Sequence, residues 1–337
     1  MAIIKFNKTI SFVAHAAVGG YEEGRGTLGA RFDFIDNNDS FGQNTWELSE
    51  AEMTRSAINI ALGKGRLSHT DISFLIGGDL QNQCVASSIG TSSFGIPFFG
   101  VYGACSTCTE SIALLSSVLS SCEDGVLGCA VTSSHNSAAE RQFRTPIEYG
   151  GQRNKSSQWT ATAAGAFILR STSNKQNSEP RVVEAMAGRI IDGATRDAAN
   201  MGAAMAFSAA DTIISYFGES GHSPADFDYI ITGDLGYTGS AILLDILKDK
   251  LPMAAARHVD CGTLLYNAEL QDIHSGASGC GTSASVFSCH FLPMLFSGKI
   301  KRVLLMSTGA LMSPSSVMQG QNIFGTTPLI HVCAGDL

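Results

Sequence analysis

The sequence predicts an α/β fold in which the second half of the chain repeats the first. One observation is the strand-like run DISFLIGGDL, residues 71 to 80, whose continuous apolar stretch suits a parallel strand covered on both faces. Another is the stretch from Phe98 to Asp124, which reads as a short apolar strand, a tight glycine-containing elbow at Cys105 and then a helix. Alternating strands and helices of this kind are typical of layered α/β proteins.

The third observation is an internal repeat. Three stretches of the first half return in the second half in the same order: residues 71–80 as 226–235, Gly103-Ala104-Cys105-Ser106 as Gly276-Ala277-Ser278-Gly279, and the strand ending at Ser133 as the strand 303–307. The last two pairs keep one register, and an insertion falls before them. A period of this length indicates a duplicated half instead of a short solenoid repeat. We expect two halves, residues 1–175 and 176–337, that form one compact unit.

Two similar halves would place their elbows near a shared pseudo-twofold axis. Asp79 and Asp234 each end a predicted strand, at the carboxyl edge where open α/β sheets carry their sites. We therefore expect Asp79, Cys105, Asp234, His274 and the loop 307–314 to converge on one pocket.

The remaining elements follow from hydrophobic pattern. Alternation predicts a strand from Lys8 to Ala17, and a broad apolar distribution predicts a buried helix from Trp46 to Leu62. Further strands are expected at 125–132 and 160–169. The strand 125–132 delivers three polar residues to the same edge, namely Ser133, Ser134 and His135. Between the two strands, residues 138–159 read as a polar loop with three cationic side chains, those of Arg141, Arg144 and Arg153.

The elbow cysteine is the strongest candidate for a reactive group. Thr107 to Glu110 has the form of a capping box, so a helix is expected to begin near Cys108. Cys105 then lies just ahead of a helix N-terminus, where unpaired N–H groups and the helix dipole favour a thiolate. Two alternatives stay open: Cys105 merely packs there, or it forms a redox pair with Cys108.

Bulk composition excludes several classes of function. The formal net charge is −8, which argues against nucleic-acid binding because that needs a basic footprint. The first residues lack the pattern of a signal peptide, and no apolar run reaches the ~18 residues of a spanning helix, so membrane association is expected to be peripheral. The nine cysteines have no regular spacing, and a reducing compartment is expected.

Several motifs resemble the thiolase-like superfamily of thiolases and ketoacyl synthases. YGACST, residues 102–107, resembles the nucleophile elbow of the condensing enzymes, HSGASG, residues 274–279, resembles their late glycine-rich loop, and MSTGA, residues 306–310, resembles their C-terminal loop. The resemblance implies a five-layered αβαβα fold. However, Asp234 falls where ketoacyl synthases carry a catalytic histidine, and Ser307 falls where thiolases carry a second cysteine.

A closer resemblance lies within that superfamily. The strings LIGGDLQNQ, YGACSTCTES, AERQFRTPIEYGGQ and SGASGCG are similar to the stage V sporulation protein AD family of spore-forming bacteria. This implies a protein that binds dipicolinic acid, pyridine-2,6-dicarboxylate, or its calcium chelate, for uptake into the developing spore. It also implies partners among the other stage V sporulation A proteins, a place on the cytoplasmic face of the spore inner membrane and, by analogy, a homodimer.

The resemblance leaves three functions in competition. The first is ligand binding without catalysis or cofactor, with seven residues expected at the ligand: Asp79, Cys105, Ser133, Ser134, His135, Asp234 and His274. The second is a thiolase or ketoacyl-synthase type acyl transferase that uses Cys105 as its nucleophile. The third is a purely structural subunit. Asp79 would repel an anion, so it is expected either to hold loop N–H groups or to accept a calcium ion carried by the ligand.

Overall fold

The computed structural model describes residues 2–143, 153–174 and 178–335. Its main feature is one large mixed sheet with the strand order β11-β10-β13-β16-β8-β1-β7-β5-β3-β4, with β2 paired to β1 at the side. Two small sheets, β12-β6 and β14-β15-β9, lie apart from it. The strands are β1 Ile3–Gly19, β2 Phe34–Ile35, β3 Ile72–Gly78, β4 Phe98–Gly100, β5 Leu127–Ser134, β6 Trp159–Thr160, β7 Ala163–Thr172, β8 Arg181–Met186, β9 Ile191–Asp192, β10 Tyr229–Thr232, β11 His258–Asp260, β12 Ala277–Ser278, β13 Arg302–Met306, β14 Gly309–Leu311, β15 Phe324–Thr326 and β16 Leu329–Cys333.

The two ends of the large sheet follow one plan. In the first, β4, β3 and β5 run parallel, β7 is antiparallel to β5, and β1 is antiparallel to β7. In the second, β11, β10 and β13 run parallel, β16 is antiparallel to β13, and β8 is antiparallel to β16. Antiparallel pairing of β1 with β8 joins the two plans. The order and direction of the strands therefore repeat, as the sequence repeat predicts.

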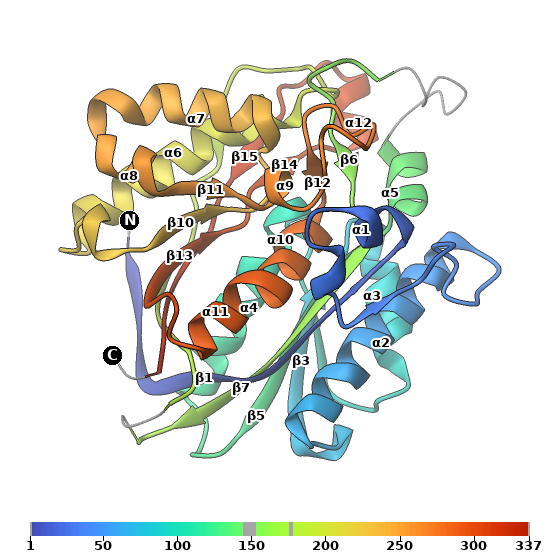
Figure 1. Ribbon diagram of the computed structural model, residues 1–337, viewed down its shortest axis with the longest axis vertical. Coiled ribbons are helices and arrows are strands. Elements are labelled where there is room, and N and C mark those ends of the chain that lie inside the picture. Colours follow the sequence, from blue (N-terminus) through green and yellow to red (C-terminus); the bar gives the residue numbers. More distant parts are fainter. Residues whose placement is uncertain (1, 144–152, 175–177, 336–337) are drawn as a thin grey trace.

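Helices cover the sheet on three levels (Figure 1). Helices α2 and α3 pack on the first half, α6, α7 and α8 lie over the second half, and α4, α10 and α11 fill the space between the halves. The helices are α1 Tyr21–Arg25, α2 Trp46–Gly65, α3 Val85–Ser92, α4 Thr107–Ser120, α5 Asn136–Phe143, α6 Met201–Glu219, α7 Gly236–Lys250, α8 Pro252–Arg257, α9 Cys261–Leu264, α10 Cys280–Val286, α11 Leu292–Phe296 and α12 Pro314–Met318. A π-helical turn, Phe287–Phe291, joins α10 to α11.

Three hydrophobic clusters match these levels. The middle cluster joins Ile112 and Leu115 of α4 and Phe287 near α10 to sheet residues of both halves, such as Phe167 and Val303. A second cluster lies between α2 and the first half, and a third lies between α6, α7 and the second half. Each sheet half is therefore covered on both faces, which explains the continuous apolar runs of its parallel strands. The predicted five-layered αβαβα arrangement is confirmed.

Most predicted elements are present with shifted ends. The expected strand 8–17 is the middle of β1, the helix from Trp46 runs to Gly65, and the strand 71–80 is β3. The strand 125–132 is β5, which continues through Ser134. The polar loop predicted for 138–159 is partly wrong, because its first residues belong to α5. Residues 144–152, which include Arg144, lie outside the described residues.

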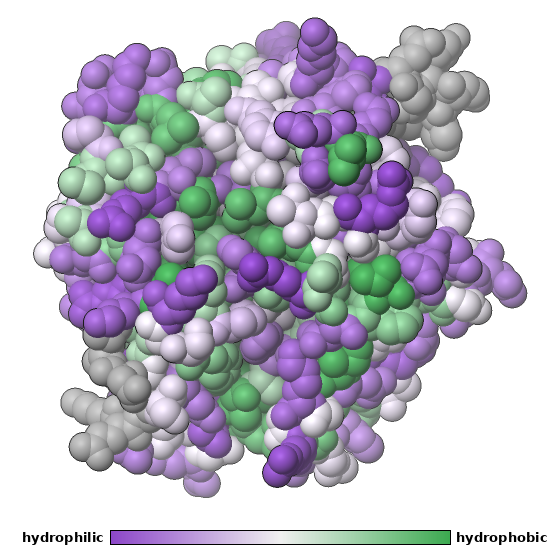
Figure 2. Space-filling model, viewed as in Figure 1, coloured by the Kyte–Doolittle hydropathy of each residue, from purple (hydrophilic) through white to green (hydrophobic). Residues whose placement is uncertain are grey.

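The surface and the cysteines bear on two further expectations. Figure 2 shows apolar residues as separate patches among hydrophilic ones on the face seen in Figure 1. Within the described residues, no helix is both long and apolar enough to cross a membrane. All nine cysteines are free thiols, so Cys105 and Cys108 form no disulfide.

Candidate ligand-binding site

The candidate site is a cavity of about 400 Å³ where the two halves meet. The first half contributes the loop after β3, the elbow before α4, one face of α5, and β6. The second half contributes the start of α6, the loop before α10, and the segment from β14 to β15. Its volume is in the range of small-molecule sites. The wall contains apolar residues, among them Leu80, Ala139, Phe143, Met201, Leu311, Met312 and Phe324, and polar residues, namely Asn82, Tyr102, Cys105, Glu140, Gln158, Thr160, Ser278, Ser313, Ser316, Gln321 and Asn322.

The elbow presents Cys105 to this cavity. Ala104 has a left-handed backbone with φ +54°, and residues Ala104–Ser106 form a single 3-10 turn before α4. The hydroxyl of Thr107 fastens the turn, because it accepts from Gly103 N at 3.2 Å and donates to the Ala104 carbonyl at 2.7 Å. A left-handed alanine costs about 1–2 kcal/mol. The elbow is thus a strained turn that its own hydrogen bonds hold in place.

The predicted start of the helix is correct to within one residue, but the predicted capping box is absent. Helix α4 begins at Thr107, and its N-cap, Ser106, makes no side-chain capping bond. The Ser106 hydroxyl instead lies within hydrogen-bond distance of two acceptors, the Gly103 carbonyl and the carboxylate of Glu110, and shares its one hydrogen between them.

Of the states of Cys105 that the sequence leaves open, its surroundings disfavour the thiolate. Burial and the neighbouring carboxyl group of Asp234 raise the pKa of the Cys105 thiol well above its usual value. The two groups act on each other, because interaction with the Cys105 thiol lowers the pKa of Asp234. An acidic neighbour in a buried site opposes the second negative charge more strongly than the helix terminus favours it. Cys105 is therefore a neutral thiol on the cavity wall.

Asp234 fastens two loops behind this thiol. It follows β10 and is buried, and its carboxylate accepts from Gly279 N at 2.8 Å and from the Thr308 hydroxyl at 2.8 Å. Burial raises the pKa of Asp234 to about 7, although the hydrogen bonds from Cys105 and Thr308 lower it. Asp260, whose pKa burial raises to about 6, holds Leu235 N and Gly236 N at the start of the next helix. Asp234 lies directly behind the wall and does not line the cavity.

Asp79 occupies the matching place after β3. Its carboxylate accepts from Gln81 N at 2.8 Å and from both the backbone N–H and the hydroxyl of Ser87, at 2.8 and 2.6 Å. Burial raises the pKa of Asp79, and it does not line the cavity. Of the two roles considered from sequence, holding loop N–H groups fits these contacts.

The three polar residues at the end of β5 are buried under the wall. Ser133 donates to the carboxylate of Glu50 at 3.0 Å, and the pKa of Glu50 is raised by burial and by Asp79 to about 8. Ser134 donates to the Ala161 carbonyl at 2.7 Å. His135 contacts the Asp39 carbonyl through Nε2 at 2.9 Å, and burial lowers its pKa. None of the three lines the cavity.

His274 and Ser307 also lie away from the cavity. His274 is part-exposed, with Nε2 2.9 Å from the Asp272 carboxylate and Nδ1 2.7 Å from the Asn154 carbonyl. Ser307 is buried between the central helices, where it accepts from the Thr109 hydroxyl at 2.8 Å and donates to the Ser283 hydroxyl at 3.0 Å. Of the seven residues expected at the ligand, only Cys105 lines the cavity. Direct ligand contact by the other six stays a prediction, and their hydrogen bonds favour a supporting role.

Several wall residues were missed from sequence. The polar sequence around Glu140 and Phe143 predicts a loop, although Ala139 and Phe143 have the i, i+4 spacing of one helix face. Gln158 is placed by its amide, which donates to the Asp234 and Ala277 carbonyls at 2.7 and 2.8 Å. Its neighbour Thr160 donates to the Glu140 carboxylate at 2.9 Å.

Neither of the two described arginines of the polar stretch 138–159 lines the cavity. Arg141 pairs with Glu47 on the surface, and Arg153 pairs with Asp272 at 2.8 Å and covers the Trp159 ring. Among the described residues, no lysine, arginine or histidine lines the cavity. The described wall therefore offers hydroxyl, amide and thiol groups, with the carboxylate of Glu140 as its charged group.

The chain matches one known family over nearly its whole length. The model of the family "Stage V sporulation protein AD (SpoVAD)" matches residues 2–332. The chain is 38% identical over 321 residues to stage V sporulation protein AD of Bacillus subtilis (strain 168), covering 94% of this chain and 92% of that protein.

Solved structures of condensing enzymes share the fold. A crystal structure of a variant of OleA from Xanthomonas campestris matches with a TM-score of 0.61 at 14% identity, covering 98% of this chain and 99% of that one. The tetronic acid condensing enzyme AbyA1 matches with a TM-score of 0.59 at 15% identity, covering 95% and 99%. At this identity the likeness concerns the fold alone.

Proposed function

The chain belongs to the stage V sporulation protein AD family, and we propose that it binds dipicolinate, pyridine-2,6-dicarboxylate, or its calcium chelate, in the cavity at Cys105. The family places the protein in sporulation. Binding, without turnover, is the proposed activity, and it serves uptake of the ligand into the developing spore.

The observation that carries this proposal is the state of Cys105. It lies on the wall of a ligand-sized cavity as a neutral thiol whose pKa is raised well above its usual value. An acyl-transfer nucleophile needs a thiolate or an adjacent general base. The group beside Cys105 is the buried carboxyl of Asp234, whose oxygens already accept hydrogen bonds from Gly279 N and the Thr308 hydroxyl, and no imidazole lines the described part of the wall. The thiol therefore suits a polar contact to a ligand better than attack on a thioester.

The wall also suits a flat, polar-edged ligand. Apolar side chains such as Leu80 and Phe143 offer surface for a ring, and hydroxyl and amide groups offer donors for carboxylate oxygens. Burying a carboxylate without enough donors costs several kcal/mol. Because the described wall has no cationic side chain, it favours the charge-balanced calcium chelate over the free dianion.

The second candidate is an acyl transferase that uses Cys105 as nucleophile. It is favoured by the placement of Cys105 at a strained elbow on the cavity wall, in a fold shared with condensing enzymes. Two residues argue against the acyl transferase. Asp234 and Ser307 stand where catalytic groups would be expected, and both form hydrogen bonds with neighbouring segments of the fold.

Calorimetric titration tests the proposal. Wild-type protein is titrated with dipicolinate, with and without calcium. Two controls are picolinate, which lacks one of the two carboxylates, and benzoate, which lacks one carboxylate and the ring nitrogen. We expect saturable binding of dipicolinate that exceeds both controls and strengthens when calcium is present. Absence of heat with dipicolinate in both conditions would refute the proposal.

Variants place the binding in this cavity. Cys105→Ala should weaken binding and Cys105→Phe should weaken it further, because the larger ring occupies part of the cavity. Cys122→Ala is the matched control, since Cys122 is a free, part-exposed cysteine just beyond the other end of α4 and does not line the cavity. If all three variants bind dipicolinate with equal affinity, the binding site is not in this cavity.

Incubation with an acyl thioester separates the two candidates. We expect no lasting mass increase at Cys105 after exposure to acetyl-CoA. A stable acyl adduct on the Cys105 peptide, lost in Cys105→Ala, would favour the acyl transferase instead.

The proposal extends to partners. We propose that the protein works as a homodimer with other stage V sporulation A proteins at the spore inner membrane, as the family resemblance implies. Analytical ultracentrifugation measures the oligomeric state. Co-sedimentation with membranes from sporulating cells tests whether the protein binds the membrane. Membranes that lack those partner proteins are the control.

A further inference from the structure

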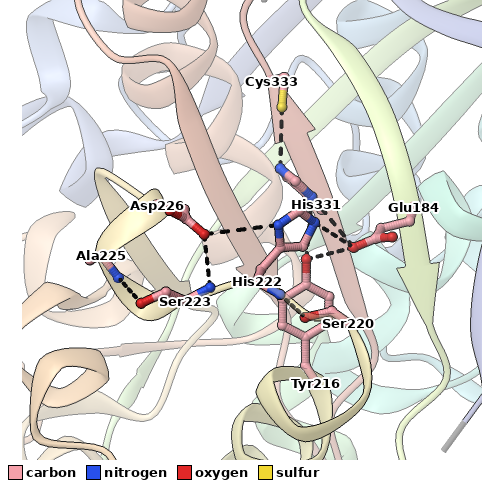
Figure 3. A network of polar contacts seen from close by, with 9 residues as sticks. All are labelled: Glu184, Tyr216, Ser220, His222, Ser223, Ala225, Asp226, His331 and Cys333. Carbon is pink, nitrogen blue, oxygen red and sulfur yellow. Dashed lines mark hydrogen bonds and ion pairs between the residues drawn. The ribbon is translucent and has the colours of Figure 1, made fainter.

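A polar cluster outside the cavity brings together two imidazoles and a carboxylate. Glu184 lies in β8 and His331 lies opposite it in β16, while His222 comes from the loop after α6. Their ligand atoms all lie within 4.8 Å of one another, and this is the one such group found in the described part of the chain. Figure 3 shows the three side chains pointing toward one another, with Tyr216 beside them.

We propose that this cluster is a binding site for a divalent transition metal of the zinc type. Two imidazole nitrogens and one carboxylate oxygen form a donor set that Zn²⁺ takes in proteins. In a tetrahedral zinc site, neighbouring ligand atoms lie roughly 3.4 Å apart. The Glu184 carboxylate is 3.5 Å from His222 Nε2 and 3.5 Å from His331 Nδ1.

Outer contacts orient two of the three ligands. A metal-bound histidine usually donates its other N–H to a nearby acceptor. Here the second nitrogen of His331 is 3.2 Å from the Cys333 sulfur, whereas the second nitrogen of His222 is 4.0 Å from the Asp226 carboxylate, which is too far for a direct hydrogen bond. The Tyr216 hydroxyl donates to the Glu184 carboxylate at 2.6 Å.

The cluster is buried on one side and open to solvent on the other. Glu184 and His331 are almost fully buried, whereas the His222 side chain is 30% exposed and leaves an entry path.

The loop that carries His222 is held by a capping box. Ser223 and Asp226 form a capping box in which Ser223 N donates to the Asp226 carboxylate at 2.8 Å. Gly221, just before His222, has φ +75° with open space around it. An ion at the cluster would tie this loop to β8 and β16, so binding should stabilise the second half of the fold. No residue of the cluster lines the cavity, so this site is independent of the proposed ligand.

Zinc titration of untagged, chelator-treated protein tests the inference. We expect one equivalent of Zn²⁺ to bind and the thermal midpoint to rise on the order of 4 °C at a hundredfold excess of free zinc over the dissociation constant. His222→Gln should weaken zinc binding by at least about 100-fold. The matched control is His274→Gln, which removes a part-exposed histidine that also pairs with a carboxylate but has no third ligand.

Cobalt substitution checks the donor set. Co²⁺ should give visible bands of a four- or five-coordinate site without a strong thiolate charge-transfer band, because Cys333 contacts the outer nitrogen of His331. Less than one equivalent of zinc in the wild type, or unchanged affinity in His222→Gln, would overturn the site. Loss of binding in Cys333→Ser together with a thiolate band would overturn the assignment of its ligands.

Discussion

Replacement of Gly279 by alanine tests how the cavity wall is built. Gly279 lies on the wall and donates its N–H to Asp234 at 2.8 Å. Its backbone, at φ +97° and ψ +152°, is in a region that residues other than glycine rarely adopt. A Cβ atom there would lie 2.7 Å from the Ser134 hydroxyl oxygen and 3.2 Å from Thr160 Cγ2.

Neither neighbour can move away freely. The Ser134 hydroxyl donates to the Ala161 carbonyl at 2.7 Å and accepts from Gly281 N at 3.2 Å. The backbone strain costs about 1–3 kcal/mol, and overpacking costs a further 1–3 kcal/mol. We therefore expect Gly279→Ala to lower the free energy of unfolding by about 2–6 kcal/mol, from these two contributions together. Dipicolinate affinity should fall as well, because relief of the clash displaces the wall.

The matched control is Gly298→Ala. Gly298 also has positive φ, +68°, but a Cβ there meets nothing within 4 Å, so only about 1–2 kcal/mol of backbone strain is expected. Urea unfolding followed by circular dichroism compares the two variants with the wild type. If Gly279→Ala loses no more stability than Gly298→Ala, the steric reasoning about the wall is refuted.

Three further predictions concern buried groups. The pKa of Glu50 is raised to about 8, so between about pH 5 and about pH 8 the folded protein keeps a proton that the unfolded chain has lost. The free energy of unfolding should therefore fall as the pH rises across this range. The thermal midpoint should fall less in Glu50→Gln, which has no such proton to lose. Cys105 should react with iodoacetamide at neutral pH more slowly than part-exposed Cys122, which peptide mass spectrometry can follow, and faster labelling of Cys105 would contradict its neutral state. Ser307→Ala should cost about 1–3 kcal/mol in urea unfolding, because it leaves the buried Thr109 hydroxyl without its acceptor; an unchanged midpoint would contradict this.

The sequence by itself determined the plan of the fold. Continuous apolar runs indicated the parallel strands β3 and β10, because strands buried on both faces need no alternation. The repeat of these strands and of the elbow indicated a doubled architecture. It also placed Asp79 and Asp234 at the carboxyl ends of two parallel strands, which is where the structure has them.

Local sequence failed where the outcome depends on contacts between distant segments. The helix N-terminus at Cys105 suggested a thiolate, but burial and Asp234, which comes from the other half, raise the pKa of the thiol. Helix α5 was missed because its polar sequence resembles a loop, and packing of Ala139 and Phe143 at the cavity settles it as a helix.

Only the tertiary structure decided which residues meet. It set Cys105 on the cavity wall and buried the polar residues at the end of β5 beneath it, because strand direction alone does not say how deep an edge residue lies. It also brought Glu184, His222 and His331 together from two strands and a loop far apart in the chain. No spacing pattern announces such a cluster, since pairing of β8 with β16 is a long-range contact that the local sequence does not encode.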